Sequence, residues 1–276
     1  MGAKSKEARR EKFIEKYQVK IIVCENCSYK NFKTFVSCLK CRNALNAEVD
    51  KFSENVFIDI ERIHGNLKSS PLSIGLAVLD RNGEVKRKEE IYILPEGEEP
   101  RRNNPLCWKV HQMYVERKNG VKVLKKLSGV KGKADPILPS VSLDEAARSF
   151  VEFLSSLGSS NLNIIYHGLD HCCLIPFLER TQVMEEFQDV VKHLINTDGF
   201  FIKVQSVNGR NYGLKTLVED WANDEVKEVY SKGSHGAYVD AFCLGWICYC
   251  PKLAKRFVEW LAFEEVLLSL DKKKII

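Results

Sequence analysis

Four acidic residues lie within apolar stretches of this 276-residue chain, or directly after them. They are Asp59 and Glu61 in Val-Phe-Ile-Asp-Ile-Glu, Asp170 in Tyr-His-Gly-Leu-Asp, and Asp240 in His-Gly-Ala-Tyr-Val-Asp. An ionised carboxylate is costly in apolar surroundings unless a cation or another partner compensates it. The fold must therefore place these acids where a cation can reach them. Carboxylates gathered in this way are what a two-metal site for phosphodiester cleavage requires.

The apolar pattern predicts an α/β sheet layered by helices. Val56–Ile60 and Leu72–Leu79 read as two buried strands. Asp80-Arg-Asn-Gly83 predicts a hairpin turn, because Asn-Gly readily adopts the positive φ values that such a turn needs. Ile91–Leu94 is then the returning strand of a group of three antiparallel strands.

Helix and parallel-strand units are expected to follow. Ser142-Leu-Asp-Glu145 is a capping box that opens an amphipathic helix, and Gly158 can end that helix. Leu162–Tyr166 reads as the next strand and leads into Asp170, while Leu214–Trp221 and Ala237–Tyr249 look helical. The expected order of elements is βββαβα with further helices.

Two CxxC pairs stand near the N-terminus. Their cysteines are Cys24, Cys27, Cys38 and Cys41. Tetrahedral zinc needs four ligands, and a two-residue gap lets both thiolates of one turn face the same ion. Because so short a segment cannot bury a core, one structural Zn²⁺ would supply its folding energy. Buried or redox cysteines are the alternative reading, and we expect the cysteines after residue 170 to be core residues.

Charge and hydropathy limit the setting. The net charge is +5, with basic excess in residues 1–20 and 97–141. Such patches suit a polyanion held at its backbone, or else form a solvated tail and a solvated loop. No apolar run is long enough to span a membrane, so we expect no membrane partner. The N-terminus is charged rather than apolar, so we expect an intracellular protein, in the nucleus or the cytoplasm, whose cysteines are reduced.

Residues 20–45 resemble the Ran-binding-protein type of zinc finger, in which an asparagine, here Asn31, lies between the cysteine pairs. Members of that family bind single-stranded RNA or ubiquitin. The resemblance implies that Phe32 stacks on a base, with Lys30 and Lys33 beside it, and basic side chains around exposed aromatics favour nucleic acid. A ubiquitin or other protein partner, or a finger that only braces the neighbouring domain, are the alternatives.

The order of elements and acids over about residues 55–265 resembles the DnaQ-like 3′–5′ exonucleases of the DEDDh group, which have a ribonuclease H-like fold. The first strand of that family carries Asp-x-Glu, and its last motif is His-x4-Asp, here His235 and Asp240. The resemblance implies that four acids hold two Mg²⁺ or Mn²⁺ ions, namely Asp59, Glu61, Asp170 and Asp240. His235 would act as the general base, brought in by a mobile loop from Ser231.

Several positions depart from that family's pattern. Arg62 stands where a threonine is usual, and only two residues separate His167 from Asp170. The segment Pro105–His111 occupies the place of a substrate-binding helix, so Trp108 could stack on a base and Lys109 could meet a phosphate.

The sequence thus predicts a basic tail (1–19), a zinc finger (20–45), a linker (46–54), an exonuclease-like domain (55–265) and a basic C-terminal tail (266–276). We expect a metal-dependent 3′–5′ exonuclease acting on nucleic acid, with RNA favoured over DNA. One alternative is an inactive nucleic-acid-binding scaffold on the same fold, like the Maelstrom proteins. The other is a ubiquitin- or protein-binding adaptor that works through the finger.

Overall fold

The computed structural model describes residues 21–23, 28, 30–32, 54–63, 70–97, 100–103, 112–128, 132–205, 213–233 and 236–271. The chain divides into two compact units, residues 53–257 and residues 1–52 with 258–276. In the latter unit, β1 (Ile21–Val23) pairs antiparallel with β2 (Lys30–Phe32). The four finger cysteines lie outside the described residues, so the zinc finger stays a prediction.

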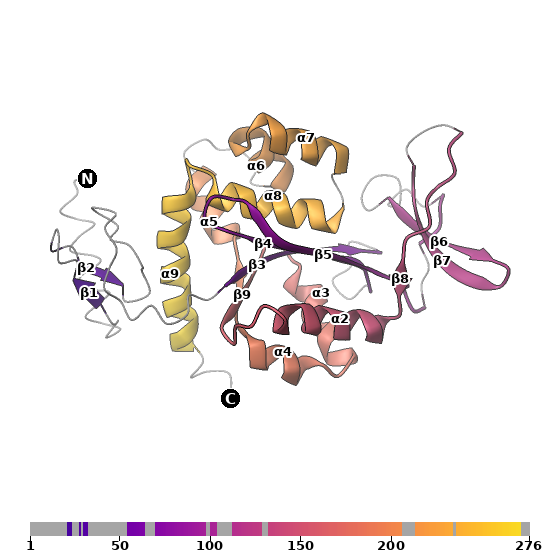
Figure 1. Ribbon diagram of the computed structural model, residues 1–276, viewed down its shortest axis with the longest axis horizontal. Coiled ribbons are helices and arrows are strands. Elements are labelled where there is room, and N and C mark those ends of the chain that lie inside the picture. Colours follow the sequence, from indigo (N-terminus) through magenta and orange to yellow (C-terminus); the bar gives the residue numbers. More distant parts are fainter. Residues whose placement is uncertain are drawn as a thin grey trace. The chain divides into compact units, whose positions relative to one another are not determined.

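A six-stranded mixed sheet forms the centre of the larger unit, in the order β10-β9-β3-β4-β5-β8 (Figure 1). Its strands are β3 (Asn55–Arg62), β4 (Pro71–Leu79), β5 (Val85–Ile93), β8 (Ser140–Val141), β9 (Leu162–Tyr166) and β10 (Val191–Asn196). Strand β4 runs antiparallel to its neighbours β3 and β5. On the other side of β3, β9 and β10 continue the sheet in parallel. The predicted mixed α/β sheet is confirmed, and its order is compatible with a ribonuclease H-like fold.

Helices cover both faces of this sheet (Figure 1). One face carries α2 (Leu143–Ser155), α3 (His171–Arg180) and α4 (Met184–Val190). The other carries α6 (Leu214–Trp221), α7 (Asp224–Gly233) and α8 (Ala237–Tyr249). Two further helices are α5 (Asp198–Gln205) and α9 (Ala254–Asp271), the latter crossing the boundary between the two units. Among the described residues, no helix is both long enough and apolar enough to cross a membrane.

The main core lies between the sheet and α2. Val56, Ile58 and Ile60 point to this face of β3, where they join Phe150 and other apolar side chains. The predicted capping box fixes the start of α2, since the amide of Glu145 donates to Ser142 Oγ and the Glu145 carboxylate accepts from the Ser142 amide. A capped amphipathic helix can therefore bury one whole face on the sheet.

Two elements have other bounds than expected, and a third segment, described below, contains strands where none was expected. β5 begins at Val85 rather than Ile91, because pairing with β4 keeps its charged residues extended. Helix α7 continues through Ser231 to Gly233, where a loop was expected, and an ion pair between Lys232 and Glu228 stabilises its last turn.

The segment read as a basic loop contains a second β-ribbon. In it, β6 (Met113–Lys118) pairs antiparallel with β7 (Val121–Lys126). The turn between them, Asn119-Gly120, has positive φ at both residues. The turn before β5 is built differently, because Gly83 has positive φ but Asn82 does not, and the Asp80 carboxylate accepts from the Asn82 amide at 2.8 Å.

Candidate metal centre

Strand β3 places two of the predicted acids on one face of the sheet. Asp59 and Glu61 are two residues apart, so their side chains point to the same side, opposite to the main core. In the neighbouring strand, Gly75 lies directly opposite Asp59. A Cβ on Gly75 would lie only 2.0 Å from the carbonyl carbon of Ala237. Only glycine therefore lets the start of α8 come this close to the sheet.

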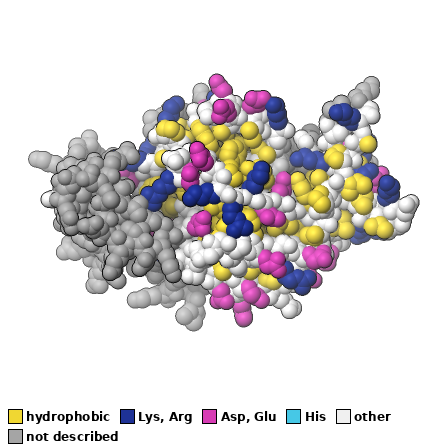
Figure 2. Space-filling view, in the orientation of Figure 1, with side chains coloured by type: hydrophobic (Ala, Val, Ile, Leu, Met, Phe, Trp, Pro, Cys, Tyr) yellow, Lys and Arg dark blue, Asp and Glu magenta, His cyan; other side chains and the backbone are white. Residues whose placement is uncertain are grey.

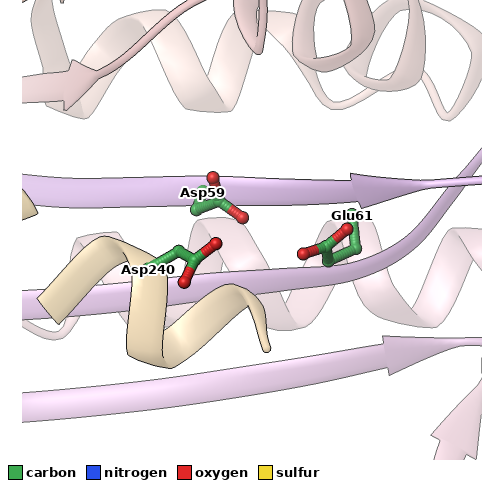
Figure 3. Close-up of side chains that lie close together, drawn as sticks. All are labelled: Asp59, Glu61 and Asp240. Atoms are coloured by element: carbon green, nitrogen blue, oxygen red, sulfur yellow. The ribbon is translucent and has the colours of Figure 1, made fainter. Parts of the chain in front are cut away.

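This close approach brings a third carboxylate to the same place. Asp240 lies in the first turn of α8, and its amide donates to the carbonyl of Gly236 at 3.1 Å. Carboxylate oxygens of Asp59, Glu61 and Asp240 all lie within 4.8 Å of one another. Figure 3 shows these three side chains gathered between β3 and α8. Carboxylate oxygens are the ligands that hard divalent cations prefer, so this triad could hold a metal ion.

Asp170 follows the parallel strand β9 and lies outside the group of three, but its charge acts on Asp59. Because β3 and β9 run in parallel, their carboxyl ends meet at one edge of the sheet, and Asp170 precedes α3 at that edge. Its side chain is buried, with 5% of the residue exposed. Its Oδ2 has no hydrogen-bond partner within the part of the chain that the structure describes. A buried carboxylate oxygen left in this way fits a site that gains a cation.

The charges of the four acids affect one another. The pKa of Asp59 lies well above its usual value, mainly because burial removes its solvation and then because Asp170 and Asp240 are negative. Burial and the charge of Asp240 likewise raise the pKa of Glu61. Burial raises the pKa of Asp170 to about 7 although Arg62 acts in the opposite direction. Without a cation, these carboxylates therefore resist full ionisation at neutral pH.

Arg62 supplies a fixed positive charge at the end of β3. Its charge lowers the pKa values of both Asp59 and Asp170. Its Nη1 atom is buried and donates no hydrogen bond to any of the residues that the structure describes. The unusual arginine thus offsets part of the negative charge of the centre, and it leaves a buried donor directed at no described acceptor.

The loop that precedes Asp170 is held by the end of β10. His167 Nδ1 lies 2.9 Å from Asp198 Oδ1, which also accepts from the Gly168 amide at 3.0 Å. Asn196 Nδ2 donates to the Gly168 carbonyl at 2.8 Å. The short gap between His167 and Asp170 is therefore accommodated by a tight turn, with φ of 73° at Gly168, that fixes the position of Asp170.

Two charged residues near the centre were not expected from the sequence. Glu90 lies opposite Gly75 in the sheet and raises the pKa of Glu61, whereas Lys126 at the end of β7 lowers it. The period-2 pattern places Glu90 on the same face as Gly75, but only once the register of β5 is known. No local signal links Lys126 to the centre, because the contact depends on how the β6–β7 ribbon packs.

Other predicted site residues lie outside the described residues. These are His235, Trp108, Lys109 and Lys33, while Lys30 and Phe32 are described only as parts of the backbone of β2. The general base and the nucleic-acid contacts therefore stay predictions. Most of the remaining cysteines are buried and unbridged as expected, namely Cys173, Cys243, Cys248 and Cys250, whereas Cys172 is half-buried.

Comparison of the sequence with protein-family models finds no match, and no curated protein matches it at a significant level.

Proposed function

We propose that this protein is a metal-dependent nuclease that removes nucleotides from the 3′ end of a nucleic acid, with single-stranded RNA favoured over DNA. The observation that carries the proposal is the meeting of three carboxylates within 4.8 Å beside a buried fourth one. Their order along the chain resembles that of the DnaQ-like exonucleases, and the sheet order is compatible with the ribonuclease H-like fold of that family.

The donor set fits divalent cations. Asp59, Glu61 and Asp240 would hold one ion, and Asp170 would join them at a second. Bound ions of this kind stabilise developing negative charge and lower the pKa of water, which is the chemistry that phosphodiester hydrolysis needs. The Oδ2 of Asp170, which has no hydrogen-bond partner among the described residues, and the raised pKa values of the acids both support a site that takes up cations.

The protein's own groups have separate tasks. The acids would hold the cations, and Arg62, whose charge lowers the pKa values of Asp170 and Asp59, would attract a phosphate oxygen. His235 would accept the proton of the attacking water, since its intrinsic pKa lies near neutrality. It stands directly before Gly236, at the start of the helix that carries Asp240.

The test is cleavage of 5′-labelled single-stranded RNA and DNA by the full chain, with Mg²⁺, with Mn²⁺ and with EDTA. We expect shortening from the 3′ end that requires the metal. Asp240→Asn should reduce the rate on the order of 10³-fold or more, because it removes a ligand without changing the size of the side chain. Because asparagine has the size of aspartate, the variant should still fold, which a thermal melt checks.

Asp189→Asn is the matched control. This substitution makes the same chemical change at an exposed residue of α4, so cleavage should persist. Cleavage that survives EDTA, or that is equal in Asp240→Asn and the wild type, would contradict the proposal. Binding without cleavage would favour a nucleic-acid scaffold, and ubiquitin binding without nucleic-acid affinity would favour an adaptor.

A further inference from the structure

The β6–β7 hairpin is a rigid ribbon rather than a free loop. A two-stranded hairpin has little stability of its own, so it must pack against the domain. The side chains of Met113, Val115 and Leu124 do so, and they form a separate cluster with Ile63 and Leu72 of the sheet region. The ribbon is thereby fixed relative to the end of β3.

A buried carboxylate ties the two ends of the ribbon together. Asp135 accepts hydrogen bonds from the Tyr114 hydroxyl, from the amide of Ser128 and from Arg102 Nε, each at 2.9 Å. The Ser128 amide is the largest of the causes that lower the pKa of Asp135 to about 2. The acid therefore stays ionised at any physiological pH, and these bonds anchor the base of the hairpin.

Beyond this anchored base the ribbon is strongly basic. Arg117 and Lys118 are exposed and Lys122 is half-buried, and the one acid of the two strands, Glu116, pairs with Lys125. Val121 at the tip has 64% of its surface exposed. Figure 2 shows Lys and Arg side chains around apolar ones over the region of β6 and β7, at the right of the view. An excess of positive charge on a projecting ribbon is the electrostatic footprint of a polyanion-binding surface.

The ribbon leads directly to the carboxylates. A Cβ on Gly236 would lie 3.5 Å from Lys126 Nζ, so the last residue of β7 lies beside the start of the helix that carries Asp240. Lys126 also lowers the pKa of Glu61. From Lys126 to Val121 the strand spans roughly 17 Å at about 3.3 Å per residue. Positive charge therefore extends from the metal centre outwards along one direction.

We propose that the β6–β7 hairpin is a nucleic-acid-binding arm for the strand whose end lies at the carboxylates. Arg117 and Lys122 are cross-strand partners on the face of the ribbon that carries Lys126, and Lys118 stands beside the turn, so that the three contact phosphates around the tip. The inference rests on the proposed function for the position of that end. The contacts are to the backbone and carry no sequence preference, as in the positively charged grooves that bind single strands.

The first test is the salt dependence of binding. Full-length protein is titrated in EDTA with a fluorescent single-stranded oligonucleotide of roughly 15 nucleotides over a series of NaCl concentrations. In the triple variant Arg117→Gln, Lys118→Gln, Lys122→Gln, the slope of log K against log salt should become shallower by about 2, since each lost phosphate contact contributes about 0.7. Affinity at low salt should fall by about 10-fold or more.

The matched control removes the same residue types elsewhere. Lys252, Lys255 and Arg256 are exposed around the start of α9, at the other end of α8 from Asp240, and their change to Gln alters net charge equally. We expect the slope of this control to equal that of the wild type. The proposal would be overturned if the slope changed equally in both triple variants, or if it did not change in the hairpin variant. The second result would favour a protein partner for the ribbon.

Failure of the arm and failure of the nuclease proposal give different results. If the slopes of the wild type and the hairpin variant differ as expected but the wild type never cleaves, the arm is supported and the nuclease proposal is wrong. If the wild type cleaves but the two slopes are equal, only the arm proposal is wrong. With an active enzyme, the hairpin variant should raise KM for the long strand and leave a dinucleotide unaffected, because the dinucleotide is too short to reach the basic side chains.

Discussion

The two faces of strand β3 are built from alternate residues of one short segment, yet they have opposite physical characters. On the face towards α2, Ile58 and its neighbours are almost completely buried among apolar side chains. On the face towards α8, Asp59 and Glu61 approach a third acid, and burial raises their pKa values. A strand with period 2 can thus place a stabilising surface directly behind a destabilising one.

The difference indicates how the molecule tolerates its acidic centre. Gathering carboxylates costs free energy in the absence of a cation, whereas burial of apolar surface on the opposite face contributes about 25 cal/mol per Å². The α2 face should therefore determine whether the domain folds, and the α8 face should determine whether it binds metal. Three substitutions, one on each face and one at the edge of the centre, test this separation.

The largest effect is expected on the α2 face. Ile58→Ala should reduce the free energy of unfolding by about 2–5 kcal/mol, because it leaves a cavity in a closely packed core. Urea denaturation measures this loss, and Val229→Ala on exposed α7 should change stability by less than about 0.5 kcal/mol. At low urea, the Mn²⁺ affinity of the folded variant should match that of the wild type. Weakened Mn²⁺ binding would show that the two faces are not separable.

On the α8 face, Gly75→Ala should have a smaller effect on stability and a larger one on metal binding. The new methyl group meets the backbone of Ala237 and Tyr238, so α8 must move away from the sheet. We expect a loss of about 1–3 kcal/mol, as for other overpacked sites, together with weaker Mn²⁺ binding measured by calorimetry.

Gly199→Ala is the control for Gly75→Ala, since a Cβ on Gly199 has nothing within 4 Å and alanine favours the helix in which it lies. It should leave Mn²⁺ binding unchanged. Normal Mn²⁺ affinity in Gly75→Ala would mean that the position of Asp240 does not depend on close contact between α8 and β4.

Much of the sheet could be predicted from local patterns. The apolar runs at Val56–Ile60 and Leu162–Tyr166 are short and continuous, and the capping box marks the start of α2. The order of the acids then indicated that Asp59, Glu61 and Asp240 would meet, as the structure confirms for these three. The strands and the capping box were accessible because each depends on residues close together in the sequence, whereas the meeting with the distant Asp240 followed from the family resemblance.

Contacts that depend on packing could not be predicted in this way. Residues 85–90 are mostly charged and were left out of the returning strand predicted at Ile91–Leu94, although pairing with β4 makes them part of it. The β6–β7 ribbon contains the turn signal Asn119-Gly120, but its basic side chains hide the alternation of apolar residues. The proximity of Glu90 and Lys126 to Glu61 follows only from these two tertiary arrangements.

At the edge of the centre, Asp170→Asn should stabilise the metal-free protein, and more so at higher pH. The folded pKa of Asp170 is about 7 and its usual value is 3.8, so the folded state binds the proton more tightly than the unfolded state. The wild type therefore loses stability as the pH rises from the unfolded pKa through the folded one, and the Asn variant lacks this loss.

Between about pH 5 and about pH 8, the stability gained by Asp170→Asn over the wild type should grow by about 1–3 kcal/mol in EDTA. Urea denaturation at both pH values measures the difference, with the exposed Asp189→Asn as the control. Mg²⁺ should reverse the order at the higher pH, because a cation bound by the ionised acids stabilises the folded wild type. A constant difference at both pH values would show that the burial of Asp170 does not oppose its ionisation. The acidic face would then impose no cost for the apolar face of β3 to offset.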